Sequence, residues 1–351
     1  MKNFHACVKA FVSNEKQSDW DVKSLFDNVD AKQTSELCAN FFNGISSEYR
    51  PLKPDQIPKG HDCPLPTITP RDVEEAVKTG KNKASTVPGD LYCDILKDCL
   101  PTMSNVIARI FNKIVTSKQW PAEWKKEHVT IIPKKPRPED LGQCRNISCT
   151  NHLSKVLERI VLGWARQQVG TKNNQFGGEQ GCSTNHLLVD MYDTITENLE
   201  DSRATSITSI DYSKAFNRLD HAKCLHSFQK KGASTQMLAL LGSFLMGRTM
   251  SVRVDQETSY PRDVNAGAPQ GSVLGTTFMF NIGTDELEEE FDYTQEDPGR
   301  FELNEGDLTF MESQHTETYA ESTPERIRLP DYFDISPIGQ DRRVVEFLPT
   351  V

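Results

Sequence analysis

A sharp change in charge after Thr284 is the sequence feature that most constrains the fold. Residues 285–351 contain 19 Asp and Glu against 5 Arg and no Lys, a net charge of −14. The whole chain has 50 acidic and 40 basic residues, so residues 1–284 retain 31 acids and 35 bases, a net charge of +4. Mutual repulsion opposes the packing of so acidic a segment. We therefore expect a mildly basic folded body, able to meet nucleic acid, and an acidic, mostly disordered tail.

The cysteines and the N-terminus predict an intracellular protein of the cytoplasm or nucleus, not a secreted one. Nine cysteines lie at irregular spacing without a C-x-x-C pair, which fits neither a disulfide framework nor a zinc ribbon. Residues 1–7 lack the apolar stretch of a signal peptide, and no apolar run approaches the roughly 20 residues of a membrane-spanning helix. We expect reduced thiols and no membrane partner.

Apolar periodicity within the body predicts both helices and strands. Pro70 in a first turn and Asp220 at a cap position each indicate a helix start, and Gly232 indicates a helix end. Six prolines between residues 51 and 70 indicate a linker or an extended segment. Helices are predicted at 36–42, 70–78, 91–99, 103–117, 153–167, 187–200, 221–231, 236–246 and 272–282. Strands are predicted at 128–133, 204–210, 250–254 and 260–264.

Two segments of the body carry residues suited to chemistry. Asp211 follows a predicted strand and precedes the aromatic Phe216, and carboxylates at such strand ends are the hard ligands that Mg²⁺ prefers. Some fifty residues later, the glycines of 267–275 permit tight turns and close approach of the backbone to a ligand. Taken separately, each segment is equally typical of a structural role: a helix-capping aspartate with a core phenylalanine, and an ordinary turn.

Taken together, the motifs resemble the reverse transcriptases of non-LTR (LINE-like) retrotransposons over roughly residues 30–284. Asp-Tyr-Ser-Lys-Ala-Phe at 211–216 looks like the first palm motif of that family, and Ala-Pro-Gln-Gly-Ser-Val-Leu-Gly at 268–275 looks like the second. Four further blocks follow the family order, at Ile132–Lys135, Arg145–Ser148, Gln175–Gly178 and Gly181–Thr184. Six blocks in the correct order make the resemblance specific.

The resemblance implies RNA-templated DNA synthesis, with an RNA template, a DNA primer and deoxynucleotides as partners. Asp211 would ligate two Mg²⁺ ions, with the backbone carbonyl of Tyr212 as a further ligand. Phe216 would exclude a ribose 2′-hydroxyl. The other implied nucleotide-binding residues are Gln270 and Gly271 beside the template, and Arg145, Lys134 and Lys135 around the triphosphate.

The implied fold is an α+β right-hand polymerase without its thumb. Its expected parts are an N-terminal helical extension with a proline-rich linker (1–65), fingers (66–203), a partial palm (204–284) and the acidic tail (285–351). The third palm motif, aromatic-x-Asp-Asp, occurs nowhere in the 351 residues. We therefore expect a fragment that is incomplete and inactive by itself, because one aspartate cannot hold two mutually repelling cations.

Departures from the family pattern leave alternatives open. Many relatives have proline where this chain has Asn146, and aspartate where it has Asn217. Two other functions are a non-catalytic nucleic-acid-binding remnant and an interaction protein that uses the acidic tail.

The potential zinc ligands His221, Cys224 and His226 lack the i, i+4 spacing of a helical zinc site and indicate an ordinary helix surface.

Overall fold

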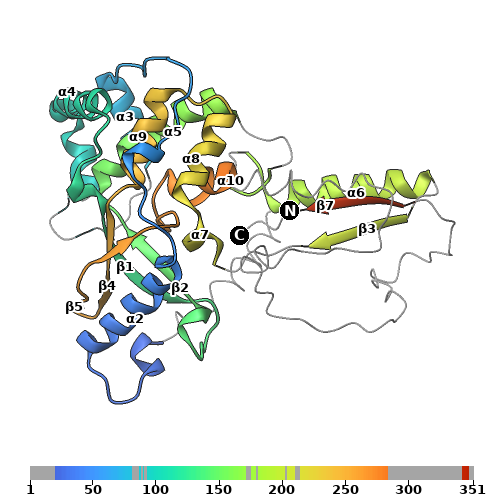
Figure 1. Cartoon of the computed structure of the whole chain (residues 1–351), viewed down its shortest axis with the longest axis horizontal. Helices are drawn as coiled ribbons and strands as arrows, with labels where there is room; N and C mark the ends of the chain where they lie inside the picture. The colour runs from blue at the N-terminus through green and yellow to red at the C-terminus, as the bar shows by residue number, and fades with distance from the viewer. Residues whose placement is uncertain are drawn as a thin grey trace. The chain divides into compact units, whose positions relative to one another are not determined.

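The chain divides into two units in the computed structural model (Figure 1). The first comprises Met1–Gly170 and Phe216–Gly283, and the second comprises Thr171–Ala215 and Thr284–Val351. The structure describes residues 20–80, 87, 90, 93–170, 175–178, 181–201, 204–209, 214–283 and 342–347.

A five-stranded mixed sheet forms the framework of the first unit. Its strands are β1 (Lys126–Pro133), β2 (Cys144–Cys149), β4 (Arg248–Val254), β5 (Glu257–Thr258) and β6 (Arg262–Val264). The order is β2-β1-β4-β5, with β6 also paired to β4. β1 runs antiparallel to β2 and parallel to β4, whereas β5 and β6 run antiparallel to β4. The strands predicted at 128–133, 250–254 and 260–264 are confirmed as β1, β4 and β6, while β2 was not predicted.

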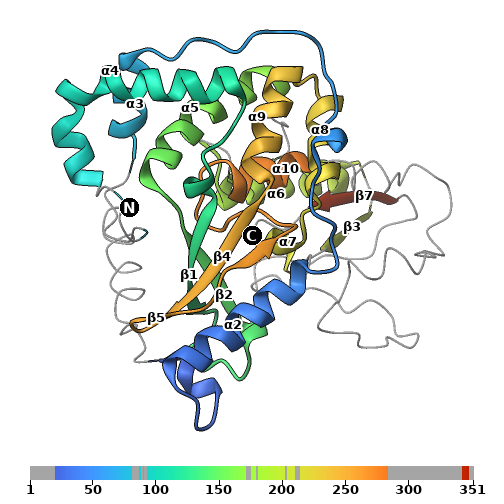
Figure 2. The ribbon, with the colours of Figure 1, turned by 60° about the vertical axis from the view of Figure 1, so that its left-hand side comes forward.

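Helices surround this sheet and bury a large apolar core. They are α2 (Ala31–Ser46), α3 (Pro70–Lys78), α4 (Cys93–Ser117), α5 (His152–Val169), α7 (Ala215–Arg218), α8 (His221–Lys230), α9 (Thr235–Leu245) and α10 (Phe280–Gly283). Helices α3, α4, α5, α8 and α9 lie at one end of the strands and α2 at the other (Figures 1 and 2). Among the described residues, no helix combines the length and the apolar character needed to cross a membrane. The α+β class is confirmed.

Helix α4 corrects two predictions. The chain forms one helix of 25 residues with Pro101 inside it, not two helices separated at 100–102. Burial of Ile107, Phe111 and Ile114 in the core outweighs the hydrogen bond that a proline cannot donate. The apolar periodicity of 103–117 predicts one buried face with Val106, Ile107, Ile110, Phe111 and Ile114, and this is wrong in part, because Val106 and Ile110 are 50% and 46% exposed. Their side chains lie on the flank of the helix that faces away from the core.

The predicted helix at 272–282 begins later than its apolar pattern indicates. A π-helical turn spans Gly275–Met279 and continues into α10. The backbone N–H groups of Val273 and Leu274 donate to the carboxylate of Glu158 at 2.6 and 3.2 Å. These bonds hold residues 273 and 274 in the preceding loop and so delay the helix.

Helix α2 packs on the sheet and forms half of a second core. Phe42 and Cys38 pack in a cluster with apolar side chains of β1 and β4. Glu36 forms an ion pair with Arg262 of β6 at 2.9 Å, and Asn43 donates to the carbonyl oxygen of Asp263 at 2.7 Å. Part of the predicted N-terminal extension is thus tied to strands more than 200 residues later in the sequence.

An extended strap, residues 47–69, runs from α2 to α3 along the helices (Figure 2). Its backbone is held by hydrogen bonds from Gln229 to Lys59 at 2.7 Å and from Thr235 to His61 at 2.9 Å. The Asn112 side chain of α4 bonds both the N–H and the carbonyl of Ile68, each at 2.8 Å. The prediction of an extended segment is confirmed, and these contacts dock it firmly.

The second unit contains α6 (Thr184–Glu200), β3 (Ala204–Ser209) and β7 (Arg342–Phe347). β3 pairs in parallel with β7, with Ala204 opposite Arg342 and Ser209 opposite Phe347. Asn198 of α6 donates to the hydroxyl of Thr205 at 3.2 Å. The three elements lie side by side in Figure 1. Strand β7, which was not among the predicted strands, thus finds a partner in β3, at the position of the strand predicted at 204–210. The rest of the acidic tail lies outside the described residues.

Candidate nucleotide-binding site

The glycine-rich loop, residues 267–271, lies against α7 and the residue that follows it, Leu219. Its N–H groups at Gly267 and Ala268 donate to the carbonyls of Leu219 and Phe216 at 2.7 and 2.8 Å. Gly267 has φ +86°, and a Cβ there would lie 2.6 Å from the Phe216 oxygen. Glycine is therefore required at this close approach. The predicted nucleotide-pocket loop is therefore in backbone contact with Phe216, the residue predicted to exclude a ribose 2′-hydroxyl.

The same loop is bonded to β2 through Ser148. The Ser148 N–H donates to the carbonyl of Gln270 at 2.8 Å, and the Ser148 hydroxyl donates to Glu127 at 2.7 Å. Glu127 in turn accepts from Arg248 Nε at 2.8 Å, and both side chains are buried. Arg248 also donates to the carbonyl of Phe244 at 3.1 Å. A buried charged network thus connects three strands to the loop.

A second buried carboxylate anchors the far end of the loop. Glu158 of α5 is fully buried and accepts from the Ser154 hydroxyl at 2.9 Å, besides the backbone N–H groups of Val273 and Leu274 just after the loop. Trp120 Nε1 donates to the same Ser154 hydroxyl at 3.2 Å. Bonds to backbone donors satisfy the buried charge. Helix α5 therefore sets the position at which the loop turns into the helix.

A small cavity lies between the loop and β2. Its volume is about 30 Å³, and Asn146, Phe216, Asn217 and Gln270 are among its lining residues. The Gln270 amide donates to Asn146 Oδ1 at 3.3 Å and to Asn217 Oδ1 at 3.2 Å, and Asn217 donates to Asn146 Oδ1 at 3.2 Å. The two residues that depart from the family pattern thus meet each other at Gln270.

His221, at the start of α8, supports the loop through a hydrogen bond to its first residue, Gly267. Its Nε2 lies 2.8 Å from the Gly267 carbonyl, which requires the neutral ring to donate there, and burial lowers its pKa to about 4. Cys224 is also buried and donates to the Met279 carbonyl at 3.5 Å, whereas His226 is exposed. The prediction of an ordinary helix surface is therefore wrong for His221 and Cys224. No cluster of three metal-ligating side chains occurs among the described residues.

We predict that stability rises with pH between about 4 and 6.5 because of His221. The unfolded chain binds a proton below the ordinary histidine pKa, whereas the buried ring does not, so acid favours unfolding. The difference amounts to on the order of 3 kcal/mol across that interval. Urea unfolding at several pH values would measure it, with His221→Asn expected to flatten the profile. An unchanged slope in the His221 variant would contradict the assignment.

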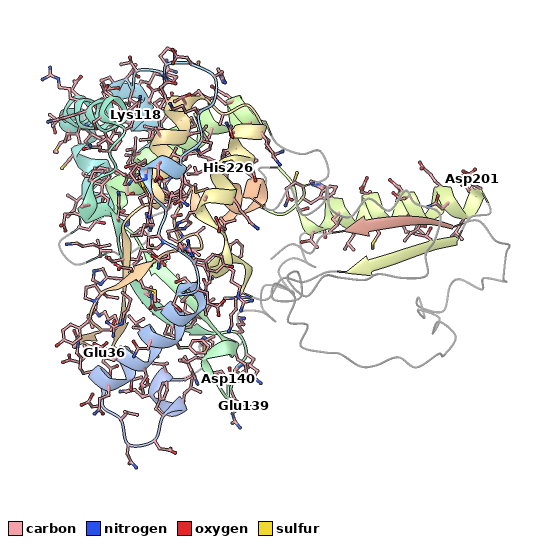
Figure 3. All side chains as sticks on the ribbon, viewed as in Figure 1. Glu36, Lys118, Glu139, Asp140, Asp201 and His226 are labelled. Carbon is pink, nitrogen blue, oxygen red and sulfur yellow. The ribbon has the colours of Figure 1, made fainter. Side chains whose placement is uncertain are left out.

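The predicted triphosphate-binding residues lie on the hairpin of β1 and β2. Arg145 is exposed on β2, on the strand face opposite to Asn146, and its guanidinium has no hydrogen-bond or ion-pair partner in the described part of the chain. Lys134 Nζ donates to the Gly142 carbonyl at 3.3 Å, and Lys135 pairs with Glu139 at 3.7 Å. Glu139 projects from the tip of this hairpin (Figure 3). Their role toward a triphosphate stays a prediction.

The predicted metal ligands, Asp211 and Tyr212, lie outside the described residues. Of the other predicted residues, the structure brings Phe216, Gln270 and Gly271 together at the cavity and its adjoining loop. Sequence reasoning missed the charged supports of this loop, which are Glu127, Glu158 and Arg248.

Comparison with known proteins gives a matching family and several relatives. A family model described as reverse transcriptase (RNA-dependent DNA polymerase) matches residues 132–302. The probable RNA-directed DNA polymerase from transposon BS of Drosophila melanogaster is 30% identical over 239 residues, covering 66% of this chain and 26% of that protein. Its counterpart from transposon X-element of the same organism is 32% identical over 222 residues, covering 61% and 24%.

A third relative is the RNA-directed DNA polymerase from mobile element jockey of Drosophila melanogaster. It is 28% identical over 229 residues, covering 63% of this chain and 25% of the relative. The chain thus spans about a quarter of the length of these curated relatives. Residues 132–302 therefore belong to the reverse transcriptase family, with relatives among the non-LTR retrotransposons.

Proposed function

We propose that this chain provides the fingers and a partial palm of a retrotransposon reverse transcriptase that copies an RNA template into DNA. In this assignment residues 66–203 are the fingers and residues 204–284 the partial palm. The observation that carries the proposal is the meeting of Phe216, the glycine-rich loop and strand β2 around one cavity. We further propose an intracellular location, in the cytoplasm or the nucleus, where template and deoxynucleotides are present.

The reaction is the attack of a primer 3′-hydroxyl on the α-phosphorus of a deoxynucleotide, with release of pyrophosphate. Phe216 excludes a ribose 2′-hydroxyl, and the backbone at Gly271 lets the template-side base approach closely. Arg145 holds the triphosphate through its planar guanidinium. Asp211 and the Tyr212 carbonyl would hold Mg²⁺, which supplies charge neutralisation at the attacking and leaving oxygens. The two lysines add positive charge at the hairpin.

We predict that this chain alone extends a primer weakly or not at all. The sequence lacks the aromatic-x-Asp-Asp motif, so Asp211 is left to balance two divalent cations. Primer extension on an RNA template with Mg²⁺ and deoxynucleotides would measure this, with Asp211→Ala as the matched variant. Synthesis that depends on Asp211 would overturn the prediction of inactivity while supporting the proposed reaction.

A non-catalytic nucleic-acid-binding remnant is the second candidate, and the missing motif favours it. The body carries a net charge of +4 while the tail carries −14, so binding is expected to be salt-sensitive and stronger without residues 285–351. Fluorescence anisotropy with a primer annealed to an RNA template would measure the affinity across a salt series. No binding at low salt by either form of the folded protein would contradict both candidates.

A further inference from the structure

The side-chain amides of Asn146, Asn217 and Gln270 form a closed ring of hydrogen bonds, which we call the amide ring. We infer that Asn146 and Asn217 are positioning residues that fix the amide of Gln270, so that its carbonyl oxygen serves as an acceptor in the nucleotide pocket. The functional part of this inference rests on the proposed function. The ring itself does not, because it is a property of the folded chain.

The hydrogen bonds of Gln270 fix its side-chain amide in one orientation. A glutamine amide has two N–H donors, and here they serve Asn146 Oδ1 and Asn217 Oδ1. Rotating the amide by 180° would put its carbonyl oxygen against two oxygens and lose both bonds. The carbonyl oxygen, Oε1, therefore stays on the side away from the ring, where it can accept a hydrogen bond.

The backbone around the ring is already fixed, which leaves the amide as the group that the ring controls. The Gln270 carbonyl accepts from Ser148, and the Phe216 carbonyl, one residue before Asn217, accepts from Ala268. Strand β2 holds Asn146 opposite Ile131 of β1. The ring encloses part of a cavity of about 30 Å³, which is room for roughly one water-sized group such as a hydroxyl.

The two asparagines have different roles in the ring. Asn146 only accepts, through Oδ1, and its Nδ2 donates to no group in the described part of the chain. Asn217 both donates to Asn146 and accepts from Gln270. Aspartate at 146 therefore keeps every bond of the ring, whereas aspartate at 217 replaces a donor with a second carboxylate oxygen facing Asn146 Oδ1. These isosteric changes form a matched pair.

The decisive test measures how fast the side-chain amide protons of Gln270 exchange with solvent, in the full chain labelled with ¹⁵N. The Gln270 signals are assigned by their loss in Gln270→Glu. We expect Asn146→Asp to preserve slow exchange and Asn217→Asp to accelerate it about tenfold, which corresponds to roughly one lost hydrogen bond. Equal exchange rates in the unaltered chain, Asn146→Asp and Asn217→Asp would overturn the proposal. Faster exchange in Asn146→Asp than in Asn217→Asp would do the same.

A cycle of alanine variants keeps the test informative if Asn217→Asp unfolds. Asn146→Ala, Asn217→Ala and their double variant form a cycle, and exchange in the double variant should match that of Asn217→Ala alone if the ring is one unit. Independent, additive effects of the two alanines would contradict the ring.

A nucleotide titration separates the ring from the proposed function. With a primer on an RNA template and Mg²⁺, Asn217→Asp should lower the ratio of dGTP to GTP affinity about tenfold, whereas Asn146→Asp should retain it. A general loss of folding would weaken both nucleotides alike. If neither nucleotide binds the unaltered protein, the proposed function fails, and the exchange result still decides whether Asn146 and Asn217 fix the amide.

Discussion

Replacing Arg248 with methionine is expected to lower the free energy of unfolding by about 3–5 kcal/mol. Arg248 and Glu127 are only 1% and 5% exposed, and their ion pair is 2.8 Å long. The variant leaves the Glu127 carboxylate buried with the Ser148 hydroxyl as its remaining bonded partner in the described residues. An unpaired charge in such a place costs several kcal/mol, far more than the loss of packing.

Two comparisons test the cause of that loss. In the Arg248→Met background, Glu127→Gln should restore part of the stability, because it removes the stranded charge. Lys126→Met, which breaks the exposed pair of Lys126 with Glu123, should change stability by less than about 0.5 kcal/mol. Urea unfolding measures all three. A loss of under about 1 kcal/mol for Arg248→Met would show that water reaches the pair.

Replacing Gly271 with alanine is expected to cost about 2–4 kcal/mol and to release the loop from β2. Gly271 has φ +140°, and a Cβ there would overlap the Ser148 carbonyl oxygen, a backbone atom that cannot swing aside. The loop must therefore move, and the 2.8 Å bond from the Ser148 N–H to Gln270 must lengthen. Faster hydrogen exchange at the Ser148 amide would report this movement.

Gly163→Ala is the matched control for that change. Gly163 lies within α5, and a Cβ added there meets no atom within 4 Å. Alanine should stabilise the helix by about 0.5–1 kcal/mol at this position. If Gly271→Ala resembled Gly163→Ala, the loop would have room that the structure does not give it.

Local patterns in the sequence predicted the elements that depend on local physics. The helix at Pro70–Lys78 and the capped start of α8 at Asp220 follow from caps that act within one turn. The two helices predicted around Pro101 are a single helix because its buried face outweighs the proline. The cost of a proline is local, whereas the burial that overrides it depends on residues far away in the chain.

In the candidate site, too, the sequence predicted the residues of the motifs but not the distant residues that support them. The motifs indicated Phe216, Gln270 and Gly271, and these residues meet at the loop. Their charged supports were missed, although Glu127 shares a strand face with Val129 and Ile131, and Glu158 lies four residues after buried Ser154. A charged residue in a buried periodic position was the available indication. Its partner could not be inferred, since Arg248 lies 121 residues from Glu127.

The link between α2 and the hairpin of β4 and β6 has a consequence for synthesis on the ribosome. Arg262, which pairs with Glu36, lies 226 residues later in the chain. At about 5–20 residues per second, α2 emerges roughly 10–40 s before the strands that cover its apolar face. Until β4 is made, Phe42 and Cys38 lack part of their native core, so a chaperone that binds apolar segments is expected to bind this helix.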